Sequence, residues 1–227
     1  MKHALFMLAA LATILGADAQ RIERENIEWL DVWIPHTNAQ AALPRVLLIG
    51  NSITRGYHRE VDKLLNGKAY VARMSTSKSV GDPGLISEIK LVMGYLDFDV
   101  VHFNNGLHGA GYTEEEYAAA FPEMVQTIKE CAKPGARLIW ATTTPVYEHP
   151  RQPDYMEKSE RVRQRNQIAA EYLKDKGIAI NDLFDLCISH PEFYKDADGV
   201  HLNPQGYVAM AAQVAREIEK QIKNLEK

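Results

Sequence analysis

PRVLLIGNSITRG, residues 44–56, is the stretch that decides the fold. Residues 46–49 form a continuous apolar run without helical spacing, which is typical of a strand covered on both faces of a parallel sheet. Gly50 ends this run and permits a tight turn. Residues 57–65 then carry apolar side chains three and four positions apart, which predicts a helix.

Ser52 therefore lies where a strand passes into a helix. At the carboxyl edge of a parallel sheet, this is where α/β proteins place their chemistry, because helix N-termini direct N–H groups at a ligand. Ser is also a common helix cap, so Ser52 could serve only as the cap of the predicted helix. This segment alone does not decide between the two roles.

The rest of the chain repeats the alternation of strand and helix. Further strands are predicted at 69–72, 99–103, 137–141 and 178–180, and further helices at 85–94, 113–132, 157–176 and from 204 onwards. Five strands alternating with helices indicate an α/β protein with a three-layer α/β/α arrangement around a parallel five-stranded sheet.

The chain has 227 residues, of which 46% are hydrophobic, enough for one well-buried domain. Residues 1–19 combine a short basic start, an apolar block and the small-residue ending Ala-Asp-Ala, which predicts a signal peptide and an exported protein. Residues 20–43 are interpreted as an N-terminal arm and residues 44–227 as the domain. Trp29 and Trp33 of the arm are expected to pack, with stacking on a sugar as the alternative.

Charge and thiol content exclude several classes of partner. The net charge is −4, which gives no electrostatic basis for binding nucleic acid. No segment after the leader is apolar enough to predict an integral membrane span. Cys131 and Cys187 are too few for a disulfide scaffold or a zinc site, and are expected to be ordinary buried residues, although export would permit a disulfide.

Asp198 and His201 lie three residues apart beside a predicted loop. A Ser hydroxyl needs a base to take its proton, a His can be that base, and an Asp on the other ring nitrogen fixes the tautomer. Ser52, His201 and Asp198 supply these three parts. Taken alone, Asp198-Gly199 could be only a turn with His201 an exposed loop residue.

Two blocks of sequence together resemble the SGNH (GDSL-type) hydrolase family. GNSIT at 50–54 is similar to its first block and DGVHLN at 198–203 to its last. The resemblance implies a flavodoxin-like fold, with Ser52 as nucleophile, His201 as general base and Asp198 as its partner. It implies no metal and no cofactor.

The second block of the family provides a backbone N–H for the oxyanion from a Gly that follows the second strand. Gly81 is the best candidate for this position, and Ser79 and Gly84 are alternatives. The resemblance therefore implies that the N–H groups of Ser52 and Gly81 would contact the oxyanion together.

The third block departs from the family's pattern Gly-x-Asn-Asp, since residues 106–109 read Gly-Leu-His-Gly. His108 thus replaces the Asn that donates to the oxyanion. A neutral imidazole still has one N–H, so His108 is a candidate donor, with Asn104 and Asn105 as alternatives. Asn51 also stands where the family usually has Asp.

These residues predict a secreted or periplasmic serine esterase that cleaves carboxylic esters, with an acetyl group on a carbohydrate as the expected substrate. A lysophospholipase or thioesterase would use the same three residues. The altered third block leaves a further alternative, a non-catalytic protein that binds a glycan.

Overall fold

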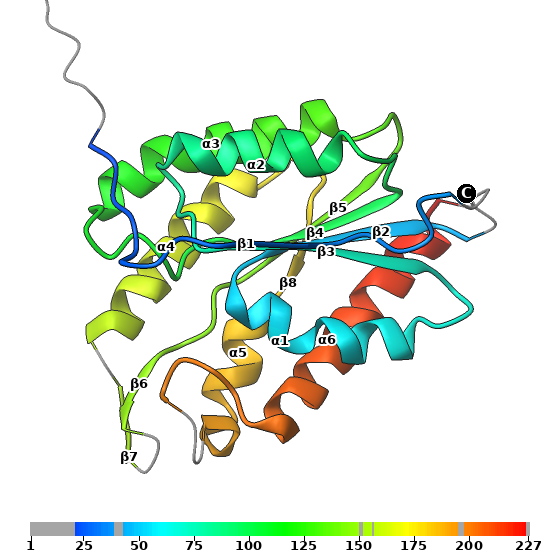
Figure 1. Ribbon diagram of the computed structural model, residues 1–227. Coiled ribbons are helices and arrows are strands. Elements are labelled where there is room, and N and C mark those ends of the chain that lie inside the picture. The colour runs from blue at the N-terminus through cyan, green and yellow to red at the C-terminus, as the bar shows by residue number, and fades with distance from the viewer. Residues whose placement is uncertain (1–20, 39–42, 150–151, 156, 195–197, 226–227) are drawn as a thin grey trace, which may run out of the picture.

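A six-stranded sheet lies between two layers of helices (Figure 1). The computed structural model describes residues 21–38, 43–149, 152–155, 157–194 and 198–225. The six strands of the sheet are β1 (Leu30–Trp33), β2 (Arg45–Gly50), β3 (Tyr70–Thr76), β4 (Val100–Phe103), β5 (Arg137–Ala141) and β8 (Ala179–Asn181).

Five of these strands are parallel and follow the order β3-β2-β4-β5-β8. This is the flavodoxin-like order, in which the chain reverses direction across the sheet between its first and third parallel strands, here β2 and β4. The expected α/β/α architecture is confirmed. The expected number of strands is wrong by one, because β1 of the arm pairs antiparallel with β3 at the edge of the sheet.

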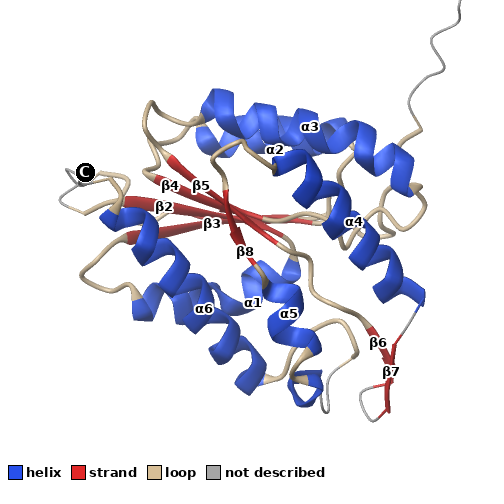
Figure 2. Ribbon diagram, turned by 180° about the vertical axis from the view of Figure 1, so that it is seen from behind, coloured by secondary structure: helices blue, strands red, loops and turns tan. Residues whose placement is uncertain are grey.

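Helices cover both faces of the sheet (Figures 1 and 2). One face is covered by α2 (Pro83–Met93), α3 (Glu114–Cys131) and α4 (Glu157–Leu173), and the other by α1 (Ser52–Leu64), α5 (Leu183–Ile188) and α6 (Pro204–Lys223). A capping box between Thr113 and Glu116 starts α3.

Two hydrophobic cores result, one on each side of the sheet. Strand β2 is buried along its whole length, because its alternate side chains enter opposite cores. Helices α1 and α6 approach closely at Gly56, where a Cβ atom would lie only 2.2 Å from the ring of Tyr207. Cys187 is buried in one core and Cys131 packs at the margin of the other, and both are free thiols.

Three short elements lie outside the predicted pattern. They are the hairpin β6 (Tyr147–His149) and β7 (Gln152–Tyr155), helix α5, and the 3₁₀ helix η1 (Pro191–Tyr194). The predicted signal peptide lies outside the described residues. Among the described residues, no helix has the length and apolar character needed to cross a membrane.

Candidate active site

Ser52 is the first residue of α1, directly after the buried strand β2. Gly50 is required before it, because a Cβ atom there would lie 2.0 Å from Oγ1 of Thr54. The side chain of Asn51 caps the helix by accepting a hydrogen bond from the N–H of Ile53 at 2.9 Å. The idea that Ser52 only caps α1 is therefore wrong, because Asn51 is the cap.

The three residues expected to act together lie in one hydrogen-bonded chain, although Ser52 and His201 are 149 positions apart. Oγ of Ser52 is 2.8 Å from Nε2 of His201, and Nδ1 of His201 is 2.6 Å from Oδ2 of Asp198. Oδ1 of Asp198 accepts hydrogen bonds from the backbone N–H groups of Val200 and His201. The Asp-x-x-His spacing thus forms a turn that orients the ring.

The charge on Asp198 is strongly stabilised. Burial alone would raise its pKa, but the hydrogen bonds from the His201 ring and from the backbone N–H groups of His201 and Val200 outweigh it and lower the pKa to about 2. An ionised carboxylate only accepts hydrogen bonds, so Nδ1 of His201 carries the proton. Nε2 of the neutral ring is then left to accept the proton of the Ser52 hydroxyl.

The site is open to solvent and lies at the positive end of a helix. The side chains of His201 and Asp198 are 43% and 59% exposed, so a substrate can approach them from outside. The N-terminus of α1 brings a partial positive charge to Ser52. This charge favours an oxyanion formed beside the hydroxyl.

Asn104 and Asn105, two of the candidate oxyanion donors, are buried and engaged elsewhere. Nδ2 of Asn104 donates to the carbonyl of Ala141 and to Oγ1 of Thr143. The side chain of Asn105 accepts from the N–H of Val80 and donates to the carbonyl of Lys78. Asn105 thereby ties the loop after β4 to the loop after β3, across the end of β2.

His108 lies on the loop after β4, with its side chain 17% exposed. Its Nδ1 is 2.8 Å from Oε1 of Glu25 on the N-terminal arm. Its Nε2 is buried and has no hydrogen-bond partner among the described residues. Sequence reasoning missed Glu25, because nothing in the sequence pattern of the arm indicates a partner 83 positions away.

Gly81, the candidate backbone donor, lies on the loop between β3 and α2. Its φ of 101° is in the left-handed region, where glycine is favoured, and the ring of Tyr112 lies 3.1 Å from where a Cβ atom would be. The alternative Gly84 lies inside α2, and its N–H donates to the capping side chain of Asp82. Oγ of Ser79, the other alternative, is buried without a hydrogen-bond partner among the described residues.

Arg165 of α4 is a further residue that the sequence did not single out. Its guanidinium is almost fully buried and donates to the backbone of the loop that carries His108. The acceptors are the carbonyls of Gly106, His108, Gly109 and Tyr112. Arg165 thus fixes the path of this loop.

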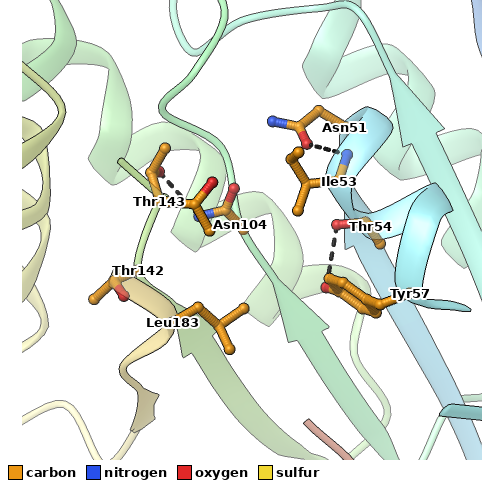
Figure 3. Close-up of a pocket in the computed structure, with 9 residues that line it drawn as sticks. Asn51, Ile53, Thr54, Tyr57, Asn104, Thr142, Thr143 and Leu183 are labelled. Atoms are coloured by element: carbon orange, nitrogen blue, oxygen red, sulfur yellow. Dashed lines mark hydrogen bonds between the residues drawn. The ribbon is translucent and has the colours of Figure 1, made fainter. Parts of the chain in front are cut away.

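A small pocket lies between the ends of β2, β4 and β5 (Figure 3). Asn51, Asn104 and Thr143 contribute polar atoms to its wall, and Ile53 and Leu183 contribute apolar ones. The pocket adjoins the chain on both sides of Ser52 and has room for about one water molecule. In the part of the chain that the structure describes, no cluster of His, Cys, Asp or Glu is arranged to hold a metal ion.

Comparison with known proteins identifies the family. Residues 96–209, half of the chain, match the sequence model of the GDSL-like lipase/acylhydrolase family. The chain belongs to this family. The resemblance inferred from the sequence blocks is therefore confirmed, and the family agrees with the expectation of an enzyme that hydrolyses esters.

Individual relatives are more distant. A human protein named isoamyl acetate-hydrolyzing esterase 1 homolog is 29% identical over 119 residues, which is 49% of this chain and 48% of that protein. The chain thus spans about half the length of the curated relative it matches.

Solved structures resemble this acylhydrolase family member in fold. A GDSL-like lipase from Bacteroides thetaiotaomicron has a TM-score of 0.61 at 21% identity, over 78% of this chain and 88% of that one. A lipase/acylhydrolase from Enterococcus faecalis also has a TM-score of 0.61, at 19% identity, over 79% of this chain and 97% of that one. At such identities the likeness shows the fold alone.

Proposed function

We propose that the protein is an exported serine esterase that hydrolyses acetyl esters. The observation that carries the proposal is the continuous hydrogen-bonded chain from Ser52 through His201 to Asp198. An ionised Asp, an oriented His and a Ser at a helix N-terminus are what acyl transfer through a Ser nucleophile needs.

The reaction has two halves. Oγ of Ser52 attacks the ester carbonyl while Nε2 of His201 takes the hydroxyl proton, and the tetrahedral intermediate collapses as His201 returns that proton to the leaving alcohol. Water, deprotonated by Nε2 of His201, then attacks the acyl carbon. The bond between that carbon and Oγ of Ser52 breaks, the carboxylic acid leaves, and His201 returns the proton to Oγ. The backbone N–H groups of Ser52 and Gly81 and the ring of His108 are the proposed contacts of the oxyanion.

A short acyl group is favoured by two observations. The pocket beside Ser52 is partly polar and has room for about one water molecule, which leaves no space there for a long alkyl chain. The human relative is named for isoamyl acetate, an acetyl ester. The proposed acyl group is therefore acetyl.

A carbohydrate is the proposed alcohol, because aromatic side chains of the arm lie at the surface. Trp33 is 57% exposed, contrary to the expectation that it would pack. Trp29 is half-buried and its ring stacks with the guanidinium of Arg55, one turn after Ser52 on α1. An exposed indole face suits stacking on a sugar ring.

Two assays on wild type and Ser52→Ala test the hydrolase. Wild type is expected to turn over p-nitrophenyl acetate and acetylated xylo-oligosaccharides and to react with a fluorophosphonate probe. Ser52→Ala is expected to lose both, and Ser87→Ala, an exposed serine of α2, to lose neither. Absence of labelling and of turnover in wild type would remove the esterase proposal and favour the glycan-binding alternative.

The series from acetyl to octanoyl p-nitrophenyl esters tests the substrate class. We expect kcat/KM to be highest for acetyl, and a maximum at octanoyl would favour a lysophospholipase or thioesterase.

Export is tested separately by the mature N-terminus. Cleavage after Ala19 would leave Gln20 as the first residue of the secreted or periplasmic protein, and an intact leader on the folded protein would contradict export.

A further inference from the structure

The N-terminal arm reaches the site through one carboxylate. Oε1 of Glu25 lies 2.8 Å from Nδ1 of His108, although the two residues are 83 positions apart. The side chain of Glu25 is 45% exposed, whereas that of His108 is 17% exposed. One end of the pair thus faces solvent and the other faces the protein interior.

Ion pairs on both sides hold Glu25 in place. Nε of Arg24 is 3.0 Å from the buried carboxylate of Asp82, and Oε2 of Glu28 is 2.5 Å from Nζ of Lys78. Strand β1 then continues the arm along the edge of the sheet (Figure 1). The carboxylate of Glu25 is therefore held by the fold beside His108.

This contact decides what His108 can do. An ionised carboxylate accepts hydrogen bonds and donates none, so the Nδ1 that faces Glu25 must carry a proton. If the ring is neutral, Nε2 then has only a lone pair and would repel an oxyanion. If the ring is an imidazolium, Nε2 carries a proton and donates a charge-assisted hydrogen bond.

The position of Nε2 calls for a partner. The atom is buried and has no hydrogen-bond partner among the described residues, and an unsatisfied buried polar atom is destabilising. The loop of His108 follows β4, and Ser52 follows the neighbouring strand β2. Ligands of open α/β sheets bind at this point, where the strand order reverses.

We propose that Glu25 is a positioning residue that holds His108 as an imidazolium, so that Nε2 donates to the oxyanion formed at Ser52. The proposal rests on the proposed esterase function and adds the N-terminal arm to its site. It also explains how a His can replace an amide donor. An Asn side chain always has an N–H to donate, whereas Nε2 of His108 has one only when the Glu25 carboxylate stabilises the imidazolium.

Two charged groups bond to His108 in the part of the chain that the structure describes. Glu25 of the arm contacts its ring, and Arg165 of α4 donates to its carbonyl at 3.0 Å.

Glu25→Gln is the decisive variant. The amide of Gln can donate to Nδ1, which leaves a neutral ring with Nε2–H, a weaker donor than an imidazolium. We expect kcat to fall about tenfold and KM to stay within about twofold of wild type. Glu23→Gln, the matched control two positions away, removes a surface ion pair with Arg21 and is expected to leave kcat and KM unchanged.

A second background separates this role from a structural one. His108→Asn introduces an amide that donates without a carboxylate partner, so Glu25→Gln should change kcat by less than about twofold in that background. An unchanged kcat in Glu25→Gln alone would overturn the proposal. If Glu25→Gln lowered kcat tenfold in both the wild-type and the His108→Asn background, the proposal would be overturned as well. Glu25 would then act through a contact other than His108.

Ring ¹⁵N NMR of His108 tests the proposal without relying on turnover. The signals are assigned by their loss in His108→Asn. We expect both nitrogens to carry protons at neutral pH in wild type and only Nε2 to do so in Glu25→Gln. An unprotonated Nδ1 of His108 in wild type would contradict the proposal even if the protein is an active esterase. If both ring nitrogens of His108 carry protons but the protein hydrolyses no ester, the result would instead count against the proposed function.

Discussion

Asp198 is the residue whose charge the site protects most strongly. Three hydrogen bonds hold its carboxylate, and its pKa of about 2 keeps it ionised at any pH at which the protein would work. In Asp198→Asn, the amide can donate to Nδ1 of His201 and turn Nε2 into a donor, which cannot take the Ser52 proton. We expect kcat/KM for p-nitrophenyl acetate to fall by about a thousandfold or more.

Asp185→Asn is the control for that substitution, because this exposed residue of α5 is distant in sequence from the three site residues. It should keep the activity of wild type. Circular dichroism should be unchanged in both variants. If Asp198→Asn retains more than about a tenth of the wild-type kcat/KM, the carboxylate does not set the tautomer of His201.

Single residues differed in how far the sequence could reveal them. The contact among Ser52, Asp198 and His201 was predictable, because each lies in a short block whose spacing reflects a local turn. Glu25 and Arg165 were not, because their partners are 83 and 53–59 positions away and an isolated Glu or Arg carries no local pattern. Their roles depend on how the layers pack.

Helix α4 acts on the site through Arg165, which bonds to four carbonyls of one loop. Arg165→Lys keeps the charge but loses the planar fork, so most of these bonds break. We expect kcat to fall about tenfold to a hundredfold, since the loop of His108 shifts, and the free energy of unfolding to fall by about 2 kcal/mol. Hydrogen exchange should accelerate in residues 106–112.

Arg163→Lys provides the comparison on the same helix. Arg163 is half-exposed and stacks on Phe184, away from this loop. Its substitution should leave exchange in residues 106–112 and kcat within about twofold of wild type. Equal exchange in the two variants would show that α4 does not hold the loop through Arg165.

At the scale of elements, periodicity predicted those that are buried on a regular pattern. The parallel strands β2, β3, β4 and β5 were found because both of their faces enter a core. Strand β1 was missed, because it is short and largely exposed and forms only through pairing with β3. The hairpin β6–β7 was missed, because a sequence rich in Pro resembles a loop.

Across the whole molecule, one buried ionisable group links stability to pH. His102 lies at the centre of the sheet on β4, is fully buried, and is bonded through Nε2 to the side-chain amide of Asn181. An amide N–H only donates, so the ring accepts and stays neutral. Burial lowers its pKa to about 4 from the usual 6.5.

The sign of the effect follows from linkage. His102 takes up a proton near pH 6.5 in the unfolded chain but only near pH 4 in the folded protein. Its contribution to the free energy of unfolding is therefore fully present above pH 6.5 and is lost as the pH falls to 4. The loss amounts to about 3 kcal/mol. Urea unfolding of His102→Gln, which stays neutral, should show a correspondingly smaller fall between pH 7 and 4, whereas the half-exposed His190→Gln should follow wild type. If the free energy of unfolding of His102→Gln and of wild type fell in parallel with pH, this prediction would be wrong. Protonation of His102 would then not be the cause of the acid destabilisation.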